Sequence, residues 1–238
     1  MSKLYTIGYA NKAITDFISI LKNKGINLLI DVRSMPYSKQ YPDYNENKIA
    51  LVLKKENILY YNLKDEFGAR RIEDEVYRRI EMYDGKEIDV VDFDEVYKLD
   101  IFQQGVKKIV TANERGFRVC FMCSEKYAFD CHRGIMIAEY FYQQGFQIEH
   151  IVDKSNTFMH NDIELYLKEN FEKCKLRFKK ENANDLRKAM YEGDLFGGIS
   201  INSNLEKWNE FFNDYSRKKA FILRNYEIGY KKGNDEND

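Results

Sequence analysis

The chain has little cysteine, little proline and almost no net charge. Its 238 residues include four cysteines and two prolines, and 38 basic against 39 acidic residues give a formal charge of -1. So few cysteines exclude a disulfide framework, and the balanced charge removes the global signal for binding nucleic acid or an anionic membrane. No run of about 20 apolar residues occurs, and the opening MSKLYTIGYA lacks the character of a secretory signal. We therefore expect a cytoplasmic protein with no membrane partner.

The sequence does contain short apolar runs that alternate with segments of helical periodicity, as in βαβ units around a parallel sheet. The five expected strands span 4–8, 27–32, 58–63, 118–123 and 147–152. The expected helices span 46–56, 96–115 and 135–144, preceded by one that Thr15 caps and Gly25 ends. The predicted fold class is α/β, with an open, mostly parallel five-stranded sheet and helices on both faces in a doubly wound arrangement.

The organisation of the chain follows from changes in composition. Residues 1–160 are predicted to form the α/β domain, and the charged stretch 64–92 an insertion within it that holds one short helix. Past residue 161 the composition shifts to Lys, Glu and Asn with scattered aromatics, which predicts a helical C-terminal extension over 161–230. The last residues, 231–238, are expected to be a disordered tail.

Polar residues gather directly after several predicted strands, and in an open parallel sheet the carboxyl ends of the strands form the ligand-binding edge. They are Gly8, Tyr9 and Asn11 after the first strand, Asp31 and Arg33 after the second, Cys123, Ser124 and Glu125 after the fourth, His150 within the fifth, and Cys131, His132 and Arg133 at the start of the next helix. Any single one has an ordinary explanation, because strands commonly end in polar loops. Their convergence from several loops favours a site.

The segment CFMCSEKYAFDCHRG, residues 120–134, has the residue types of a zinc site. Alternate side chains of a strand share a face, so Cys120 and Cys123, three apart, are expected to point to opposite faces. That geometry argues against zinc and against redox chemistry at the C-x-x-C, whose pairs sit at a helix start. We therefore expect Cys120 in the core, and neither a metal nor a cofactor.

What remains is a site in which the Cys-His-Arg triplet opens a helix. A helix N-terminus lowers the pKa of a thiol and holds an anion, which makes Cys131 the first candidate thiolate and Cys123 the second, with Arg133 as a bidentate donor. In the alternative interpretation Asp130 caps the helix, the sulfurs pack, and Arg133 pairs with Glu125 in a structural knot. The phosphate-loop pattern of a Cys followed by an Arg six positions later is absent.

The loop DVRSMPYSKQYPDY contains both prolines of the chain, Pro36 and Pro42, and is therefore expected to be stiff. Its tyrosines Tyr37, Tyr41 and Tyr44 are of the right type to stack against a planar ligand. The alternative is that they cover the edge of the sheet.

Two histidines lie outside these segments. His150 falls within the fifth predicted strand, and His160 just before a helix. A lone histidine in a strand is more often a hydrogen-bonded structural residue than a base. A role as general base requires His150 to face the same crevice as the thiols.

Several of these motifs together resemble a known family. They are TIGYA, DVRSMPYSKQYPDY, GAR at 68–70, the LYYNL strand, CFMCSE, CHR and the His-Ile pair at 150–151. In this order and spacing, from about residue 3 to residue 165, the chain resembles the family catalogued as domain of unknown function 488. The resemblance implies a set of site residues, and it implies no substrate.

Two functions are compatible with these residues. The first is an enzyme acting on a small anionic substrate, such as a nucleotide or a nucleic-acid end. Its predicted catalytic residues are Cys131, Glu125, Asp31, Cys123 and His132, and its predicted anion-binding residues are Arg33, Arg133, Gly8, Tyr9, Ser34, Tyr37 and Tyr41. In this set a cysteine is either a nucleophile or a thiol ligand. The second is a non-catalytic module that binds a nucleotide or nucleic acid through the tyrosine-rich loop.

Overall fold

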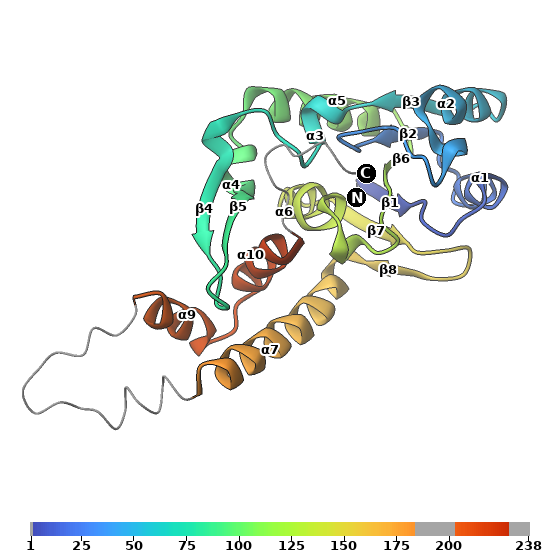
Figure 1. Cartoon of the computed structure of the whole chain (residues 1–238). Coiled ribbons are helices and arrows are strands. Elements are labelled where there is room, and N and C mark those ends of the chain that lie inside the picture. Colours follow the sequence, from blue (N-terminus) through green and yellow to red (C-terminus); the bar gives the residue numbers. More distant parts are fainter. Residues whose placement is uncertain (1, 184–202, 229–238) are drawn as a thin grey trace, which may run out of the picture.

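The computed structural model describes residues 2–183 and 203–228, and its centre is a six-stranded sheet of order β3-β2-β6-β1-β7-β8 (Figure 1). The strands are β1 (Lys3–Gly8), β2 (Leu28–Asp31), β3 (Leu59–Asn62), β6 (Val119–Cys123), β7 (Gln147–Ile151) and β8 (Thr157–Met159). The first five pair in parallel, which confirms the predicted sheet. The short β8 pairs antiparallel with β7 and was not predicted.

Helices cover both faces of the sheet, as the continuously apolar strands require. One face carries α1 (Ile14–Asn23) and α2 (Glu46–Lys55), and the other carries α5 (Asp100–Glu114) and α6 (Glu139–Gln143). Cys120 packs in the core under α1 and α2, whereas Cys123 packs in the core under α5 and α6. The prediction that these two cysteines point to opposite faces is confirmed.

Three helix boundaries differ from the prediction. Thr15 is not the cap of α1, because the helix begins at Ile14 with Ala13 in the N-cap position. The helix expected over 96–115 is divided into α4 (Phe93–Val96) and α5, since Asp92 caps α4 and the chain turns extended before Asp100. The helix expected from 135 begins earlier, as a π-helix over Arg133–Ala138 that continues into α6.

The insertion is more ordered than predicted. The short helix is α3 (Lys64–Phe67), and it is followed by an antiparallel hairpin of β4 (Tyr77–Glu81) and β5 (Glu87–Val91). The hairpin was missed because β4 has a single buried residue, Ile80, so that its apolar alternation is weak. Single turns of 3-10 helix lie at Pro42–Tyr44, Asp74–Val76, Ala128–Asp130 and His160–Asp162.

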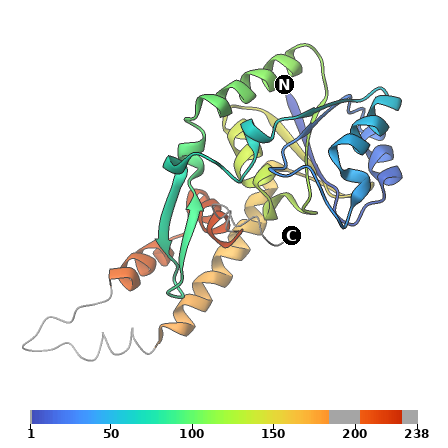
Figure 2. The same cartoon turned by 45° about the horizontal axis from the view of Figure 1, so that its top comes forward.

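The helical extension is confirmed and packs against this hairpin. It contains α7 (Ile163–Glu181), α9 (Ser203–Asn213) and α10 (Arg217–Ile228), and Figure 2 shows α10 beside the hairpin. The two share a third core that includes Tyr83, Phe178, Trp208 and Phe212. The expected disordered tail, 231–238, lies outside the described residues.

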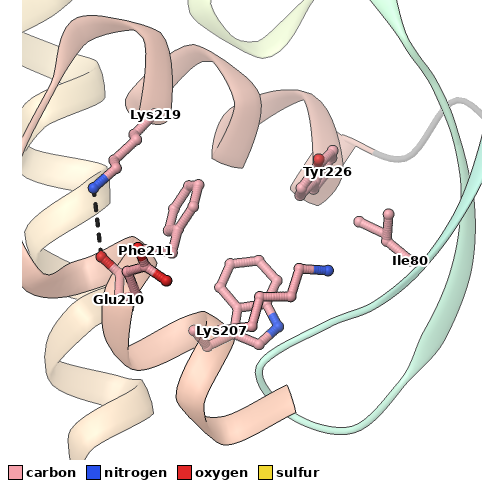
Figure 3. Close-up of a pocket in the computed structure, with 7 residues that line it drawn as sticks. Ile80, Lys207, Glu210, Phe211, Lys219 and Tyr226 are labelled. Carbon is pink, nitrogen blue, oxygen red and sulfur yellow. Dashed lines mark hydrogen bonds between the residues drawn. The ribbon is translucent and has the colours of Figure 1, made fainter. Parts of the chain in front are cut away.

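A pocket of about 280 Å³ opens in this lobe, between the hairpin and the helices α9 and α10 (Figure 3). It is lined by Ile80, Lys207, Trp208, Glu210, Phe211, Lys219 and Tyr226. None of these residues belongs to the strand-end loops.

Within 2–183 and 203–228, every helix is too short or too polar to span a bilayer.

Candidate functional site

The carboxyl ends of β1, β2 and β6 lie side by side in the middle of the sheet. Gly8 of β1 is the register partner of Cys123 in β6, and Asp31 of β2 is the partner of Met122. The pairing continues past the strands, since the amide of Tyr9 donates to the Cys123 carbonyl at 3.1 Å. The loops that follow these three strands therefore start from one edge.

The two sulfur-bearing segments meet at this edge. Sγ of Cys123, Sγ of Cys131 and a ring nitrogen of His132 all lie within 4.8 Å of one another. The Nδ1 atom of His132 is 4.0 Å from Sγ of Cys123 and 3.7 Å from Sγ of Cys131. The other ring nitrogen, Nε2, is 2.9 Å from the carbonyl oxygen of Val32. Because a carbonyl only accepts, Nε2 carries a proton and donates it to Val32, and this hydrogen bond turns Nδ1 toward the two sulfurs.

Arg133 is buried beside this cluster, and part of its guanidinium makes no hydrogen bond among the described residues. The side chain is 1% exposed, and Nη2 donates to the carbonyl of Lys126 at 3.1 Å. Among the described residues, Nε and Nη1 have no hydrogen-bond partner, and neither has Oε2 of Glu125. Nη1 and Oε2 are 3.9 Å apart, which is an ion-pair distance and too long for a hydrogen bond. The structural pairing of Glu125 with Arg133 that we considered is therefore loose.

The electrostatics favour one thiolate in the pair. Burial and the charge of Glu125 raise the pKa of the Cys123 thiol, but the neighbouring Cys131 thiol and His132 lower it to about 6. Burial and the Cys123 charge together hold the pKa of Cys131 well above its ordinary value. Against burial, the two thiols and His132 lower the pKa of Glu125 to about 2. Cys123, our second choice from the sequence, is thus the better candidate for the charged sulfur.

The structure adds a cation that sequence reasoning missed. Lys12, in the loop after β1, is half-buried, and its Nζ donates to the Gly8 carbonyl at 2.8 Å. Burial, followed by the positive charges of Arg133 and Lys126, lowers the pKa of Lys12 to about 8. Two other cations therefore repel Lys12 at this edge. The only signal in the sequence was a lysine four positions after the end of β1.

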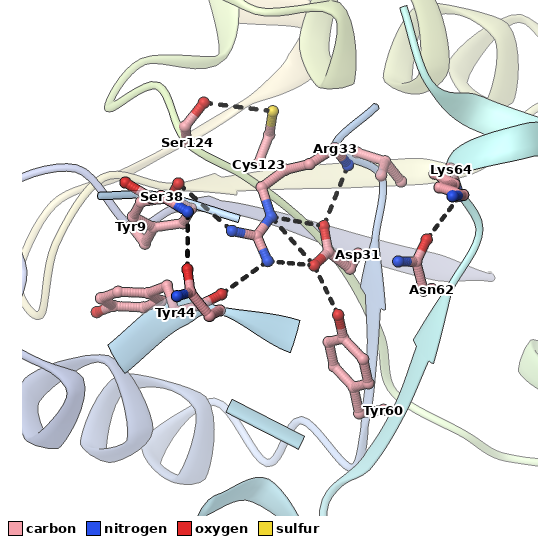
Figure 4. A network of polar contacts seen from close by, with 12 residues as sticks. Tyr9, Asp31, Arg33, Ser38, Tyr44, Tyr60, Asn62, Lys64, Cys123 and Ser124 are labelled. Carbon is pink, nitrogen blue, oxygen red and sulfur yellow. Dashed lines mark hydrogen bonds and ion pairs between the residues drawn. The ribbon is translucent and has the colours of Figure 1, made fainter. Parts of the chain in front are cut away.

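Asp31 and Arg33 also lie at this edge, but they are paired with each other (Figure 4). Arg33 donates to both carboxylate oxygens of Asp31, with Nε 2.9 Å from Oδ1 and Nη2 2.5 Å from Oδ2. The hydroxyl of Tyr60 donates to Oδ2 of Asp31 at 2.7 Å, and Nη2 of Arg33 also donates to the carbonyl of Tyr44. Both charged side chains are buried, so this pair holds the loop after β2 in place.

The predicted tyrosines divide between the core and the surface. Tyr44 is buried and stacks on Tyr9, with ring centroids 4.3 Å apart. The hydroxyl of Tyr41 bonds to Oδ1 of Asn11, whereas Tyr37 is 58% exposed. The three tyrosines of this loop therefore do not form one continuous stacking surface.

Ser34 connects this loop to the GAR segment. Its hydroxyl accepts a hydrogen bond from the backbone N–H of Arg70 at 3.0 Å. A side chain at Gly68 would place its Cβ 3.0 Å from the Ser34 hydroxyl and 2.4 Å from the Lys64 carbonyl. The close approach of these two segments therefore requires glycine at position 68.

His150 faces inward and belongs to a buried chain of hydrogen bonds. Nδ1 of His150 is 2.8 Å from the Thr6 hydroxyl, and Nε2 is 2.8 Å from Nδ1 of His160. Nε2 of His160 is in turn 2.8 Å from Glu139, which also receives Arg217 of α10. A carboxylate only accepts, so Nε2 of His160 donates to Glu139 and Nε2 of His150 donates to Nδ1 of His160. Both neutral rings therefore carry their proton on Nε2, and Nδ1 of His150 accepts from the Thr6 hydroxyl. Glu139 and Arg217 gave no signal in the sequence.

This chain predicts a pH-dependent stability. Burial lowers the pKa of both His150 and His160, so below about pH 6.5 the unfolded chain binds protons that the folded chain excludes. Stability then falls with acidification, by about 1.4 kcal/mol per pH unit for each histidine. In a His150→Gln variant the amide still donates to His160 but does not titrate. We expect its urea-unfolding free energy to depend on pH less steeply between pH 6.5 and 5.5.

The control is Lys154→Gln, at an exposed position of the turn between β7 and β8, which is expected to keep the wild-type slope. Equal slopes for His150→Gln and wild type would contradict this account of the buried histidines.

The fold and this cluster define an α/β protein with a Cys-His-Arg centre at the carboxyl edge of its sheet. The family model described as "Domain of unknown function DUF488" matches residues 13–141, more than half of the chain, and the chain belongs to this family. The resemblance seen in the motifs is thereby confirmed over these residues. No curated protein and no solved structure matches the chain.

Proposed function

We propose that the chain is an enzyme that acts on a small anionic substrate, such as a nucleotide or a fragment of nucleic acid, at the carboxyl edge of β1 and β6. The observation that carries the proposal is the buried guanidinium of Arg133, whose Nε and Nη1 have no hydrogen-bond partner among the described residues. A buried donor without an acceptor is costly, and an anion would remove that cost. Arg133 and Lys126 repel Lys12, and an anion would relieve this repulsion as well.

The neighbouring residues suggest roles in the reaction. Glu125 is close to the thiols and to Arg133, and we assign it general acid or base chemistry. Cys123 and Cys131 act with His132 as the reactive centre, either as nucleophile and supporting thiol or as ligands. We assign anion binding to Arg133 rather than to Arg33, since Asp31 already neutralises Arg33. Cytoplasmic location is part of the proposal, because a reducing compartment keeps the free thiols available.

Anion binding is tested by titration calorimetry with inorganic phosphate and with nucleoside monophosphates. The Arg133→Met variant exchanges a buried charge for an apolar side chain, so we expect it to fold. Loss of charge-assisted hydrogen bonds of about 1.5–3 kcal/mol predicts an affinity roughly 10- to 100-fold weaker than that of the wild type. The matched control is Arg79→Met, which removes an exposed arginine of the hairpin and should bind as the wild type does.

Catalysis is tested by mass spectrometry of the probes that bind. Glu125→Gln is expected to retain binding and to slow conversion by about 100-fold or more. Unchanged affinity in Arg133→Met, or no binding of any probe by the wild type, would contradict the proposed anion site. Full conversion by Glu125→Gln would remove the assigned role of that carboxylate.

The second candidate function is a binding module without turnover. The exposed ring of Tyr37 favours it, because an exposed tyrosine in a stiff loop is a stacking surface for a base. It predicts that a nucleotide binds without being converted and that Tyr37→Ala weakens binding by about 1–3 kcal/mol. If the chain is a binding module, Tyr37→Ala should weaken binding more than Arg133→Met does. If it is the proposed enzyme, Arg133→Met should weaken binding more.

A further inference from the structure

We infer that Cys123, Cys131 and His132 bind one zinc ion. Thiolate and imidazole are the ligands that zinc prefers in proteins, and the combination of two cysteines and one histidine occurs in catalytic zinc sites. The sequence had argued against zinc at the C-x-x-C, because Cys120 and Cys123 point to opposite faces of the sheet. The structure pairs Cys123 with Cys131 instead, across a loop, and adds His132.

The separations of Nδ1 of His132 from the two sulfurs fit a tetrahedral ion. With Zn–S near 2.3 Å and Zn–N near 2.0–2.1 Å, tetrahedral angles place a sulfur and a nitrogen ligand about 3.6 Å apart. The two observed distances from Nδ1 of His132 are 3.7 Å to Cys131 and 4.0 Å to Cys123. Closing the difference takes a few tenths of an ångström, which side-chain torsions supply.

The histidine is oriented as a zinc ligand requires. Nε2 of His132 lies 2.9 Å from the Val32 carbonyl, just past the end of β2. Metal-binding histidines typically donate their second N–H to a carbonyl or a carboxylate, which fixes the ring and the tautomer. Here the backbone just past the end of β2 holds the ring so that Nδ1 points at both sulfurs.

A second observation points to a ligand at the same place. Oε2 of Glu125 is buried and has no hydrogen-bond partner among the described residues, although it stands next to the thiols. Glu125 is not one of the three residues whose ligand atoms lie mutually close. Three protein ligands with a carboxylate beside a fourth, open position is the arrangement of a catalytic zinc rather than of a closed structural site.

Zinc binding goes beyond the proposed function, and in one respect it deepens it. If zinc is bound, the sulfurs are ligands and not nucleophiles. The reactive centre of the proposed enzyme is then the open zinc position, with Glu125 beside it and Arg133 as the anion-binding group. The presence of the zinc itself does not depend on whether an anion binds.

The test is the metal content of the full chain, purified without an affinity tag or chelator and measured by plasma mass spectrometry. We expect about one zinc per chain, and a loss of at least tenfold in Cys131→Ser and in His132→Gln. The glutamine can still donate to the Val32 carbonyl, so that this variant removes the Nδ1 ligand alone. The matched control is Cys120→Ala, on the same strand as Cys123 but facing the opposite core, which should keep its zinc.

A second measurement does not depend on the folding of the variants. Wild-type chain stripped of metal and titrated with Co²⁺ should develop thiolate-to-cobalt charge-transfer bands and the intense visible bands of tetrahedral cobalt, with an endpoint at one ion per chain. The inference would be overturned if the wild-type chain is purified without metal and develops none of these bands on titration with Co²⁺. Stoichiometric iron in place of zinc would overturn the choice of metal, and equal loss of zinc in Cys120→Ala would overturn the choice of ligands.

The failure of this inference is distinguishable from that of the proposed function. If zinc is present and Arg133→Met binds phosphate as the wild type does, the metal site stands and the proposed anion site is removed. If the chain takes up neither zinc nor cobalt but binds phosphate in a way that depends on Arg133, the anion site stands and the metal site is removed.

Discussion

A Gly8→Ala variant is expected to lose the site and much of its stability. A Cβ at position 8 would lie 1.7 Å from the carbonyl oxygen of Glu125 and 2.7 Å from its carbonyl carbon. Both are backbone atoms, so no change of rotamer relieves the clash, and β1 must separate from the loop after β6. Overpacking in a well-ordered core costs about 1–3 kcal/mol and occasionally more. We expect the upper end of this range, measured by urea unfolding followed by circular dichroism.

The same substitution would displace the functional groups. The added Cβ would also lie 3.0 Å from Nη2 of Arg133, and Gly8 is the register partner of Cys123. We therefore expect Gly8→Ala to weaken phosphate binding together with stability. The control is Gly85→Ala in the hairpin turn, where φ is +79° and no atom beyond the neighbouring residues of the chain lies within 4 Å of the new Cβ. Gly85→Ala should lower the free energy of unfolding by only about 1–2 kcal/mol, the cost of a left-handed backbone at a residue with a Cβ. If Gly8→Ala lowers the free energy of unfolding by no more than Gly85→Ala does, position 8 tolerates a Cβ and the predicted clash is wrong.

A Trp208→Ala variant is expected to destabilise the lobe formed by the hairpin and the C-terminal helices by about 3–5 kcal/mol. Trp208 is 2% exposed and lies edge-on to Tyr83 of the hairpin, with ring centroids 5.7 Å apart. Its indole N–H donates to the carbonyl of Glu81 at 2.9 Å. Truncation opens a cavity and leaves that carbonyl without its donor. The measurement is thermal unfolding by circular dichroism.

The matched control for the tryptophan is Trp208→Phe, which retains an aromatic ring and loses the N–H. We expect it to cost about 1–2 kcal/mol, mainly for the unpaired carbonyl of Glu81. Equal melting temperatures for wild type and Trp208→Ala would contradict the packing described for this core.

The tryptophan variant also tests the domain organisation that we propose, an α/β domain over 1–160 and a helical extension over 161–230. The buried chain from Thr6 to Arg217 of α10 connects the two. We expect a single unfolding transition in the wild type, because this chain and the shared hairpin couple the parts. A variant Trp208→Ala that melts in two steps would show that the coupling is weaker than the contacts suggest.

The strands could be predicted because their cause is local. Continuous apolar runs such as NLLIDV have to be buried on both faces, and all five predicted strands lie within one residue of their observed bounds. The separation of Cys120 from Cys123 also followed from local geometry, the period of two along a strand. The hairpin of the insertion could not be predicted, since β4 has one buried side chain and its partner surface is a helix more than 100 residues away.

The sequence alone determined the class of fold, the edge of the sheet at which polar residues collect, and the residue types present there. Only the tertiary structure decided how these residues are paired. It joined Asp31 to Arg33 and placed Tyr44 in the core. It also left Nε and Nη1 of Arg133 and one oxygen of Glu125 without hydrogen-bond partners among the described residues. It brought Cys131 and His132 to Cys123, and a carbonyl of the segment after β2 orients the His132 ring so that Nδ1 points at the sulfurs. The reason is physical: secondary structure depends on neighbours in the chain, whereas pairing among polar side chains depends on distances of a few ångströms between segments that only the folded chain brings together.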